Sequence, residues 1–314
     1  MKPLVEMQHA RLSVPTGHIF QKRKVILGDV SFSVQQGTST AYLGTNGAGK
    51  TSTFRILCGL VKPDQGRVLF DGEPMSKGLP PKRFGFMPEH PYFYKNLTPQ
   101  ELLEGLGRLS GLQSHGLKKN IQVWAEKLDF EHVLKQRLAT CSKGQVQRVG
   151  LAQALIHQPD FILLDEPLSG LDPLGRARVR QVIHEEMKRG ATVLFSSHIL
   201  SDAEAMCDQV VVLQQGEVTY SGEIHTLLAQ QNRWLIKVRT ASDVACLAES
   251  STVFSRDGVQ HIRGESLATR DAMIQRILSM RDATLMAVEF EQRTLEDAFM
   301  DLLQNRGASD ASRD

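Results

Sequence analysis

The 314-residue sequence is poor in cysteine. Cys58, Cys141, Cys207 and Cys246 lie far apart and form neither a Cys-x-x-Cys pair nor a Cys/His cluster. This spacing argues against a disulfide framework and against a zinc site. It fits a protein of the reducing cytoplasm.

Long apolar runs are also missing. No stretch approaches the roughly 20 apolar residues that a helix needs to cross a bilayer. Residues 1–14 mix charged and polar side chains among the apolar ones, so they lack the apolar core of a signal peptide. We therefore expect any membrane role to come through a partner chain or through surface docking.

The chain has no excess of charge of one sign. It carries 37 Lys and Arg against 35 Asp and Glu, a formal net charge of +2. Basic residues and aromatic residues do not alternate in any block. Both features argue against a general nucleic-acid binder, which neutralises phosphates with many cations.

What is present is an alternation of short apolar strands with helical stretches over residues 1–230. The strands are predicted at 40–43, 84–87, 161–164, 192–195 and 210–213, and helices at 51–57, 174–189 and 201–206. Such alternation predicts an α/β fold with a parallel sheet that helices cover on both faces. Residues 98–157 have a helical pattern instead, opened by a capping box of Thr98 and Glu101.

Residues 231–306 are expected to form a small second domain of α+β type. The predicted order is strand–helix–strand–strand–helix–strand, which is the ferredoxin-like pattern. Asp257-Gly258 predicts a hairpin turn between two of these strands. The last helix is expected to be capped by Thr294 with Asp297. Residues 307–314 are polar and are expected to be a flexible tail.

A phosphate-binding loop is predicted between the strand at 40–43 and the helix that follows. The segment Gly44-Thr45-Asn46-Gly47-Ala48-Gly49-Lys50-Thr51, followed by Ser52, matches G-x-x-x-x-G-K-[ST]. A chance match in a chain of this length has odds of about 1%. Glycines let backbone N–H groups surround phosphates, and the helix N-terminus adds partial positive charge. Lys50 would contact the β- and γ-phosphates, and Thr51 would ligate Mg²⁺. The alternative is a glycine-rich turn with a solvated lysine.

Two acids follow the apolar strand at 161–164, at the sheet edge where α/β proteins bind ligands. Asp165 suits Mg²⁺, and Glu166 suits the attacking water as general base or positioning group. Acids after strands are also common helix caps, so this pair depends on the phosphate loop for its interpretation. His198 ends the next strand after Ser196 and Ser197, where it can reach the γ-phosphate, although a lone histidine is more often structural.

The segment Cys141-Ser142-Lys143-Gly144-Gln145, with Gln147 and Arg148 beyond it, resembles the signature of ATP-binding-cassette (ABC) proteins. The usual pattern begins with Leu or Tyr where this chain has Cys141, and often has Gly in place of Lys143. The residues that contact nucleotide in the family, Ser142, Gly144 and Gln145, are kept. Without the resemblance, the same residues are a serine cap and the first turn of a helix, and both interpretations can hold together.

Other segments resemble the family in order and spacing, over residues 5–228. Residues 169–172 are similar to the D-loop, which includes Asp172, and His198 to the switch histidine. Phe20 stands where the family stacks an aromatic ring on adenine, or else simply packs. Glu89 stands where the family usually has glutamine. Its oxygen can bind Mg²⁺ or water, but it adds negative charge near a triphosphate, and it could equally be a solvated loop acid.

The resemblance implies a P-loop NTPase core with an inserted helical signature subdomain at about 89–158. It implies ATP and Mg²⁺ as cofactors and a second ATPase subunit as partner. Two cassettes would close head to tail, so that Ser142 and Gly144 of one chain meet the γ-phosphate held by the other. On this basis the catalytic residues are Lys50, Glu166 and His198. The metal ligands are Thr51, Glu89 and Asp165.

Residues 294–299, Thr-Leu-Glu-Asp-Ala-Phe, resemble the tail of cassettes from drug, polyketide-antibiotic and sodium exporters. This resemblance implies an exporter subunit that works with separate permease chains at the cytoplasmic face of the plasma membrane. The alternative for the segment is a terminal helix that packs on its own domain. The alternatives for the whole chain are a non-transport ABC ATPase and a regulatory nucleotide-binding module. A GTPase is disfavoured because no NKxD-like guanine reader is present.

Overall fold

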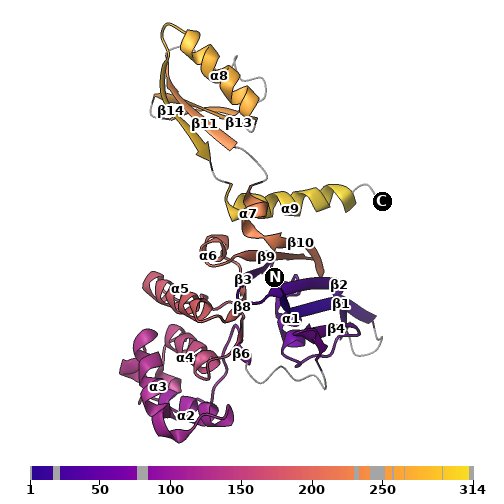
Figure 1. Cartoon of the computed structure of the whole chain (residues 1–314), viewed down its shortest axis with the longest axis vertical. Coiled ribbons are helices and arrows are strands. Elements are labelled where there is room, and N and C mark those ends of the chain that lie inside the picture. Colours follow the sequence, from indigo (N-terminus) through magenta and orange to yellow (C-terminus); the bar gives the residue numbers. More distant parts are fainter. Residues whose placement is uncertain are drawn as a thin grey trace. The chain divides into compact units, whose positions relative to one another are not determined.

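The computed structural model describes residues 2–16, 22–75, 84–229, 233–240, 252–256, 258–264, 266–291 and 293–310. The chain divides into two compact units, Met1–Glu223 and Ile224–Asp314 (Figure 1). Each unit has its own sheet and is described by itself. The predicted domain limits at residues 230 and 306 stay predictions. In the described part of the chain, no helix is long and apolar enough to cross a membrane.

The first unit is built on a ten-stranded sheet with the order β5-β4-β1-β2-β10-β9-β3-β8-β7-β6. Its strands are β1 (Pro3–Thr16), β2 (Lys22–Gln35), β3 (Ser39–Gly44), β4 (Gln65–Phe70), β5 (Glu73–Pro74), β6 (Phe84–Met87), β7 (Phe161–Leu164), β8 (Thr192–Ser197), β9 (Gln209–Gln214) and β10 (Glu217–Glu223). Strands β9, β3, β8, β7 and β6 run parallel, as predicted. Each of β3, β7 and β8 is buried along its whole length, as expected between two helical layers.

The prediction of a parallel sheet holds for the five strands β9, β3, β8, β7 and β6, but the sheet as a whole is mixed. β1 pairs antiparallel with β2 and β4, β4 with β5, and β10 with β9. The turn at Gln215-Gly216 joins β9 to β10 as a hairpin, so the sheet continues past β9. Both turn residues have positive φ, 49° and 80°, which is the backbone of a two-residue hairpin loop.

Helices of the first unit flank the parallel strands. α1 (Lys50–Leu57) contacts β2 and β3, whereas α5 (Pro173–Lys188) and α6 (Leu200–Glu204) contact β8. The core under the antiparallel strands includes three aromatic rings, Phe70, Phe84 and Phe161, whose centroids lie 5.5 to 6.4 Å apart. This packing fixes the strands whose ends carry the site residues.

The helical segment predicted between residues 98 and 157 is present. It contains α2 (Pro99–Leu109), α3 (Ser114–Lys127), the short 3-10 helices η2 (Glu131–Val133) and η3 (Leu138–Thr140), and α4 (Lys143–Leu155). The predicted capping box of α2 is confirmed, since Thr98 and Glu101 exchange side-chain-to-backbone hydrogen bonds. We call residues 99–155 the helical lobe.

The second unit contains an antiparallel four-stranded sheet with the order β12-β13-β11-β14. Its elements are α7 (Ile224–Leu228), β11 (Arg233–Arg239), β12 (Thr252–Arg256), β13 (Val259–Gly264), α8 (Leu267–Ser279), β14 (Thr284–Glu291) and α9 (Leu295–Asp310). The hairpin of β12 and β13 and the cap of Thr294 with Asp297 are confirmed. The predicted helix at 242–248 lies outside the described residues.

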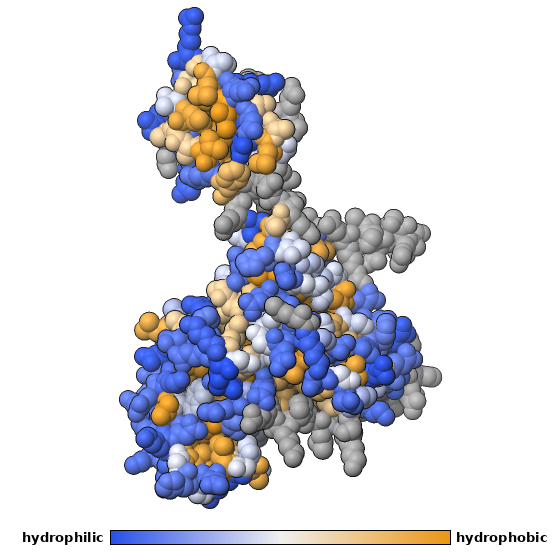
Figure 2. All heavy atoms as spheres, in the orientation of Figure 1, coloured by the Kyte–Doolittle hydropathy of each residue, from blue (hydrophilic) through white to orange (hydrophobic). Residues whose placement is uncertain are grey.

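A small apolar core holds the second unit together. Trp234, Ile236 and Val238 of β11 pack with Met273 and Ile277 of α8. Figure 2 shows apolar side chains gathered on the face that this unit presents there, whereas hydrophilic side chains cover most of the visible face of the first unit.

Candidate functional site

The phosphate-loop segment lies between β3, which ends at Gly44, and α1, which begins at Lys50. Gly49 is the N-cap of α1 and has a φ of 112°. A Cβ at Gly49 would lie 2.6 Å from Leu27 Cδ2, and one at Gly44 would lie 2.4 Å from the Leu213 carbonyl oxygen. Side chains are therefore excluded at both positions, which explains glycine at both ends of the loop.

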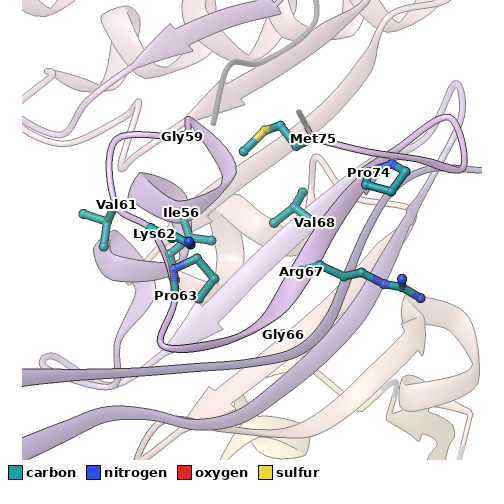
Figure 3. A pocket seen from close by; sticks show the side chains of 10 residues that line it. All are labelled: Ile56, Gly59, Val61, Lys62, Pro63, Gly66, Arg67, Val68, Pro74 and Met75. Carbon is teal, nitrogen blue, oxygen red and sulfur yellow. The ribbon is translucent and has the colours of Figure 1, made fainter. Parts of the chain in front are cut away.

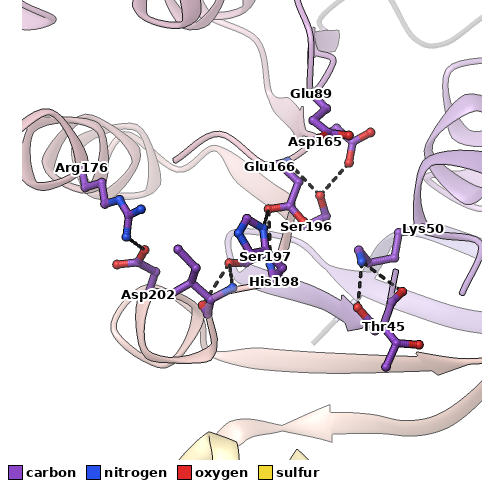
Figure 4. Close-up of polar contacts among 12 residues, drawn as sticks. Thr45, Lys50, Glu89, Asp165, Glu166, Arg176, Ser196, Ser197, His198 and Asp202 are labelled. Carbon is purple, nitrogen blue, oxygen red and sulfur yellow. Dashed lines mark hydrogen bonds and ion pairs between the residues drawn. The ribbon is translucent and has the colours of Figure 1, made fainter. Parts of the chain in front are cut away.

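Lys50 is buried and turned back over the loop that precedes it. Its Nζ donates to the carbonyl oxygen of Gly44 at 2.7 Å and to that of Thr45 at 3.4 Å (Figure 4). An ammonium held this way stands over the backbone of the loop, where the positive end of α1 adds to its field. The arrangement concentrates positive charge in one place, as anion binding requires.

A pocket of about 580 Å³ joins this loop to the carboxyl ends of the parallel strands. Its described lining contains Lys24, Ile26, Asn46, Gly47, Gly49, Lys50, Thr51, Ser52, Glu89, Asp165, Glu166 and His198. The structure therefore brings together ten residues that the sequence predicted from four separate segments. Phosphate-binding groups, oxygen ligands and a carboxylate–imidazole pair share one cavity.

Asp165 is buried and receives hydrogen bonds from two hydroxyl groups. Ser196 Oγ donates to Asp165 Oδ1 at 2.7 Å, and the Thr51 hydroxyl also bonds to this carboxylate. Burial raises the pKa of Asp165, and the charge of Glu89 raises it further, while the hydroxyl groups and Lys50 lower it. Thr51, Glu89 and Asp165 all line the pocket, and their side chains carry oxygen atoms of the kind that Mg²⁺ prefers.

Glu166 has a φ of 51°, in the left-handed region that a glutamate seldom adopts. Three hydrogen bonds hold this backbone. The Glu166 N–H donates to Ser196 Oγ at 2.8 Å, and the Glu166 carbonyl accepts from Gln147 Nε2 at 3.3 Å and from the Ser169 N–H at 3.1 Å. Strain of this kind costs about 1–3 kcal/mol and persists only where neighbours fix it. Here it directs the carboxylate toward His198 (Figure 4).

The Glu166 carboxylate meets both the side chain and the backbone of His198. Its Oε2 lies 2.6 Å from His198 Nδ1 and accepts from the His198 N–H at 3.3 Å. The histidine side chain is half exposed on the pocket side, and the glutamate side chain is 10% exposed. An imidazole in this position can hold the carboxylate in one orientation.

Ser142, Gly144 and Gln145 do not line this pocket in the described residues. They form the start of α4, where Ser142 Oγ accepts from the Gln145 N–H and Gln145 Oε1 accepts from the Ser142 N–H at 2.7 Å. The serine cap predicted from the sequence is therefore confirmed. The first turn of α4 remains open to solvent or to another molecule, because Ser142 is exposed.

Asp172 also lies outside the pocket lining. It is the N-cap of α5, accepting from the Gly175 N–H at 3.2 Å, and it pairs with Arg148 at 3.2 Å. Arg148 also binds the Asp129 carboxylate at 2.9 Å. Asp172 is thus bound within its own chain, between the signature helix and α5. Phe20, predicted to stack on adenine, lies outside the described residues.

Sequence reasoning missed four residues of the site. Ser196 and Gln147 were noticed only as neighbours of His198 and of the signature, yet both bond to the backbone of Glu166, and Ser196 also bonds to the Asp165 carboxylate. Lys24 and Ile26 of β2 line the pocket, and no sequence pattern marks them. A polar residue at the end of a buried strand was the available signal for Ser196.

A second pocket, of about 490 Å³, lies beside the end of α1 and β4 (Figure 3). Its described lining is largely apolar, with Ile56, Val61, Val68 and Met75, and its charged members are Lys62 and Arg67. It contains no carboxylate among these residues and therefore lacks the chemistry of the first pocket. The first pocket is the candidate active site.

Comparison with known proteins decides the family. The profile described as "ABC transporter" matches residues 27–169. An uncharacterized ABC transporter ATP-binding protein of Synechocystis sp. is 34% identical over 294 residues, which cover 93% of this chain and 82% of that protein. This chain belongs to the ABC transporter ATP-binding proteins. It is the ATP-binding subunit of an ABC transporter and an ATPase.

Two further ABC proteins bear on assembly and transport. The bacitracin transport ATP-binding protein BcrA of Bacillus licheniformis is 32% identical over 284 residues, which cover 87% of this chain and 91% of BcrA. A dimeric ATP-binding cassette solved with ADP and Pi has a TM-score of 0.64 and 22% identity. The match covers 70% of this chain and 98% of that cassette. That likeness shows the ABC fold.

Proposed function

We propose that this ABC subunit works as one half of a cassette pair that encloses two Mg²⁺–ATP molecules and drives export through separate permease chains. The observation that carries the proposal is that the signature residues are not among the described residues of the phosphate pocket. The phosphate pocket contains the loop, the carboxylates and His198, but its described lining includes no residue of the signature. A second chain can supply Ser142 and Gly144 from the open end of α4.

Within one chain, the loop from Gly44 to Ser52 holds the triphosphate, and Lys50 turns from the loop carbonyls to the β- and γ-phosphates. Thr51, Asp165 and Glu89 are the proposed ligands of Mg²⁺, and the raised pKa of Asp165 supports a site that gains from a cation. When bound, the ion would offset phosphate charge. Phe20 is proposed to stack on adenine.

Glu166 is proposed to orient and deprotonate the attacking water, with His198 holding its carboxylate. The His198 Nδ1 contact at 2.6 Å and the constrained backbone of Glu166 support these roles. A water between Glu166 and the γ-phosphate would lose a proton to the Glu166 carboxylate as its oxygen bonds to the γ-phosphorus, while the bond from that phosphorus to the bridging oxygen breaks and ADP leaves. Gln145 and Asp172 are proposed to contact the nucleotide that the partner chain holds. In its own chain, Gln145 belongs to the capping box of α4 and Asp172 caps α5.

Export is proposed chiefly from one similarity. BcrA, to which most of the chain is similar, is named for bacitracin transport. The segment at 294–299 supports export less than its resemblance implied, because Leu295 and Ala298 are fully buried and α9 packs against α7 in the same unit. That burial gives the segment a structural role. The permease would hold this subunit at the cytoplasmic face of the plasma membrane.

We also propose that the second unit is ferredoxin-like. The strand order β12-β13-β11-β14 and its all-antiparallel pairing support this type, since they are the order expected when the second and fourth strands flank the first and third.

The pair is tested with the Glu166→Gln variant, which keeps the shape of the side chain but cannot accept a proton. We expect it to bind ATP, to lose hydrolysis by about 100-fold or more, and to elute as a dimer in light scattering only when ATP is added. Lys50→Ala in the same background is the control and should stay monomeric because it cannot hold the triphosphate.

A Glu166→Gln protein that stays monomeric at saturating ATP, with or without the co-expressed permease, would overturn the pairing.

Each of the two alternative functions predicts its own observation. Wild-type protein that binds ATP without releasing phosphate would be a regulatory module. Co-purification with ribosomes, rather than with a multi-span membrane protein, would indicate a non-transport ABC ATPase.

A further inference from the structure

His132 of η2 lies beside the signature helix, and its contact with Gln145 is not part of the family motif described above. His132 Nε2 is 3.1 Å from Gln145 Nε2. The same glutamine closes the capping box of α4, where its Oε1 accepts from the Ser142 N–H at 2.7 Å. One side chain therefore contacts both the cap of the signature and a histidine from another element.

The hydrogen bond between Ser142 and Gln145 determines which atoms donate and which accept in the contact with His132. Because Gln145 Oε1 faces an N–H, the other corner of the amide is the NH₂ group and must donate. His132 Nε2 must then accept, which leaves the imidazole proton on Nδ1. If position 132 offered only a donor, the amide would lose either the bond to Ser142 or the bond to residue 132.

The backbone that carries His132 is held from both sides. Arg148 of α4 binds the Asp129 carbonyl oxygen at 3.0 Å, and Val133 is buried. Gln136 Nε2 also donates to the His132 carbonyl oxygen at 3.2 Å. The imidazole is thus presented to Gln145 from a fixed segment, although the ring itself is exposed.

We propose that His132 is a positioning residue for the signature: by accepting from Gln145 it keeps the Ser142 cap in the form that receives the γ-phosphate of the partner chain. This inference rests on the proposed pairing. His132 acts through Gln145 and is not among the described residues that line the phosphate pocket. What position 132 must supply is a neutral hydrogen-bond acceptor.

The test uses full-length protein in the Glu166→Gln background and measures the ATP concentration at which half of the protein is dimeric. His132→Ala and His132→Lys remove the acceptor, whereas His132→Gln places an amide oxygen near the position of Nε2. We expect Ala and Lys to raise the half-dimer concentration by roughly 3- to 10-fold, the effect of one hydrogen bond. Gln should restore it. His115→Ala, at an exposed histidine of the same lobe, is the matched control and should leave it unchanged.

Failure of this inference is distinguishable from failure of the pairing. Ser142→Arg places a bulky side chain at the cap and should abolish the ATP-dependent dimer. If it dimerises normally, the pairing itself is wrong. If Ser142→Arg is monomeric while His132→Ala and His132→Lys dimerise like their parent, only the role of His132 is overturned. A His132→Gln protein that behaves like His132→Ala would also overturn the role of His132, because the glutamine variant keeps a hydrogen-bond acceptor at position 132 and the alanine variant does not.

Discussion

His198 Nδ1 lies 2.6 Å from Glu166 Oε2, so the imidazole at the end of β8 donates to the carboxylate that follows β7. The two strands are parallel neighbours in the sheet, and their carboxyl ends therefore meet at one edge. This contact makes the orientation of Glu166 depend on His198. The carboxylate and the imidazole are thus hydrogen-bonded to each other across the ends of two neighbouring strands.

Removal of the imidazole should slow hydrolysis more than it weakens binding. His198→Ala is expected to lower kcat by about 100-fold, the scale of one acid–base partner, with KM for ATP within roughly 3-fold of wild type. His198→Asn, whose Nδ2 lies close to the position of Nδ1, should recover part of kcat. Steady-state phosphate release measures both constants. Equal kcat for wild type and His198→Ala would show that Glu166 needs no such partner.

Ser196 is expected to be the most damaging hydroxyl to remove. Its Oγ donates to Asp165 and accepts from the Glu166 N–H, so Ser196→Ala removes one of the two hydroxyl donors to the buried Asp165 carboxylate and the acceptor of the Glu166 N–H. We expect the free energy of unfolding to fall by about 1–3 kcal/mol and kcat to fall as Glu166 leaves its constrained conformation. Ser197→Ala is the control, because that hydroxyl bonds only to the Ile199 backbone among the contacts described. Denaturant unfolding should separate the two variants; similar stabilities would contradict the bridging role.

Asp165→Asn should stabilise the ligand-free protein. Burial raises the pKa of Asp165, so the Asp165 carboxylate binds a proton more tightly in the folded protein than in the unfolded chain. Ionised Asp165 therefore disfavours folding at pH values above the ordinary range near 4. At pH 7 the variant should gain roughly 2–4 °C in Tm, and the gain should shrink as the pH falls toward 4. Asn keeps an oxygen that accepts from Ser196.

The same variant should lose the stabilisation that Mg²⁺ adds to bound ATP. Thermal melts of both proteins, with ATP alone and with ATP and Mg²⁺, measure this difference. A Tm below wild type at pH 7 in ligand-free buffer would contradict the sign of the electrostatic argument. An undiminished magnesium effect would remove Asp165 from the metal site.

Two glycines of α2 should respond in opposite directions to alanine. A Cβ at exposed Gly105 meets nothing within 4 Å, whereas one at buried Gly107 would lie 2.9 Å from a methyl group of Leu117. Gly105→Ala is therefore expected to stabilise the chain by about 0.5–1 kcal/mol through helix propensity. Gly107→Ala should stabilise it less or destabilise it, because Leu117 of α3 must move. Chemical denaturation of both variants tests this; equal gains would show that α2 and α3 pack loosely.

The sequence predicted those parts of the site that depend on local pattern. The phosphate loop can be recognised without a structure, because its motif, including Gly49 and Lys50, lies in one short segment between a predicted strand and a predicted helix. Asp165 was found because it follows a fully apolar strand, and His198 because it ends the next predicted strand. Ser196 was not assigned a role, since its bonds require that β7 and β8 be adjacent, and no local pattern states which strands are neighbours.

Other features were hidden for a different reason. The left-handed φ of Glu166 is a tertiary effect, because a glutamate has no local preference for it. Asp172 was assigned to nucleotide from the resemblance, but its cap and its pairing with Arg148 appear only in the fold. The antiparallel strands were missed at β1, whose long run of mixed residues with an irregular register conceals the alternation.

Arg148 ties the carboxylates of Asp129 and Asp172 together through one guanidinium group. A displacement of residues 169–172 must therefore either carry the helical lobe with it or break an ion pair. Both carboxylates are about half exposed, 47% and 58%, so added electrolyte screens them. The contribution of these two ion pairs to holding residues 169–172 against the helical lobe therefore weakens as ionic strength rises.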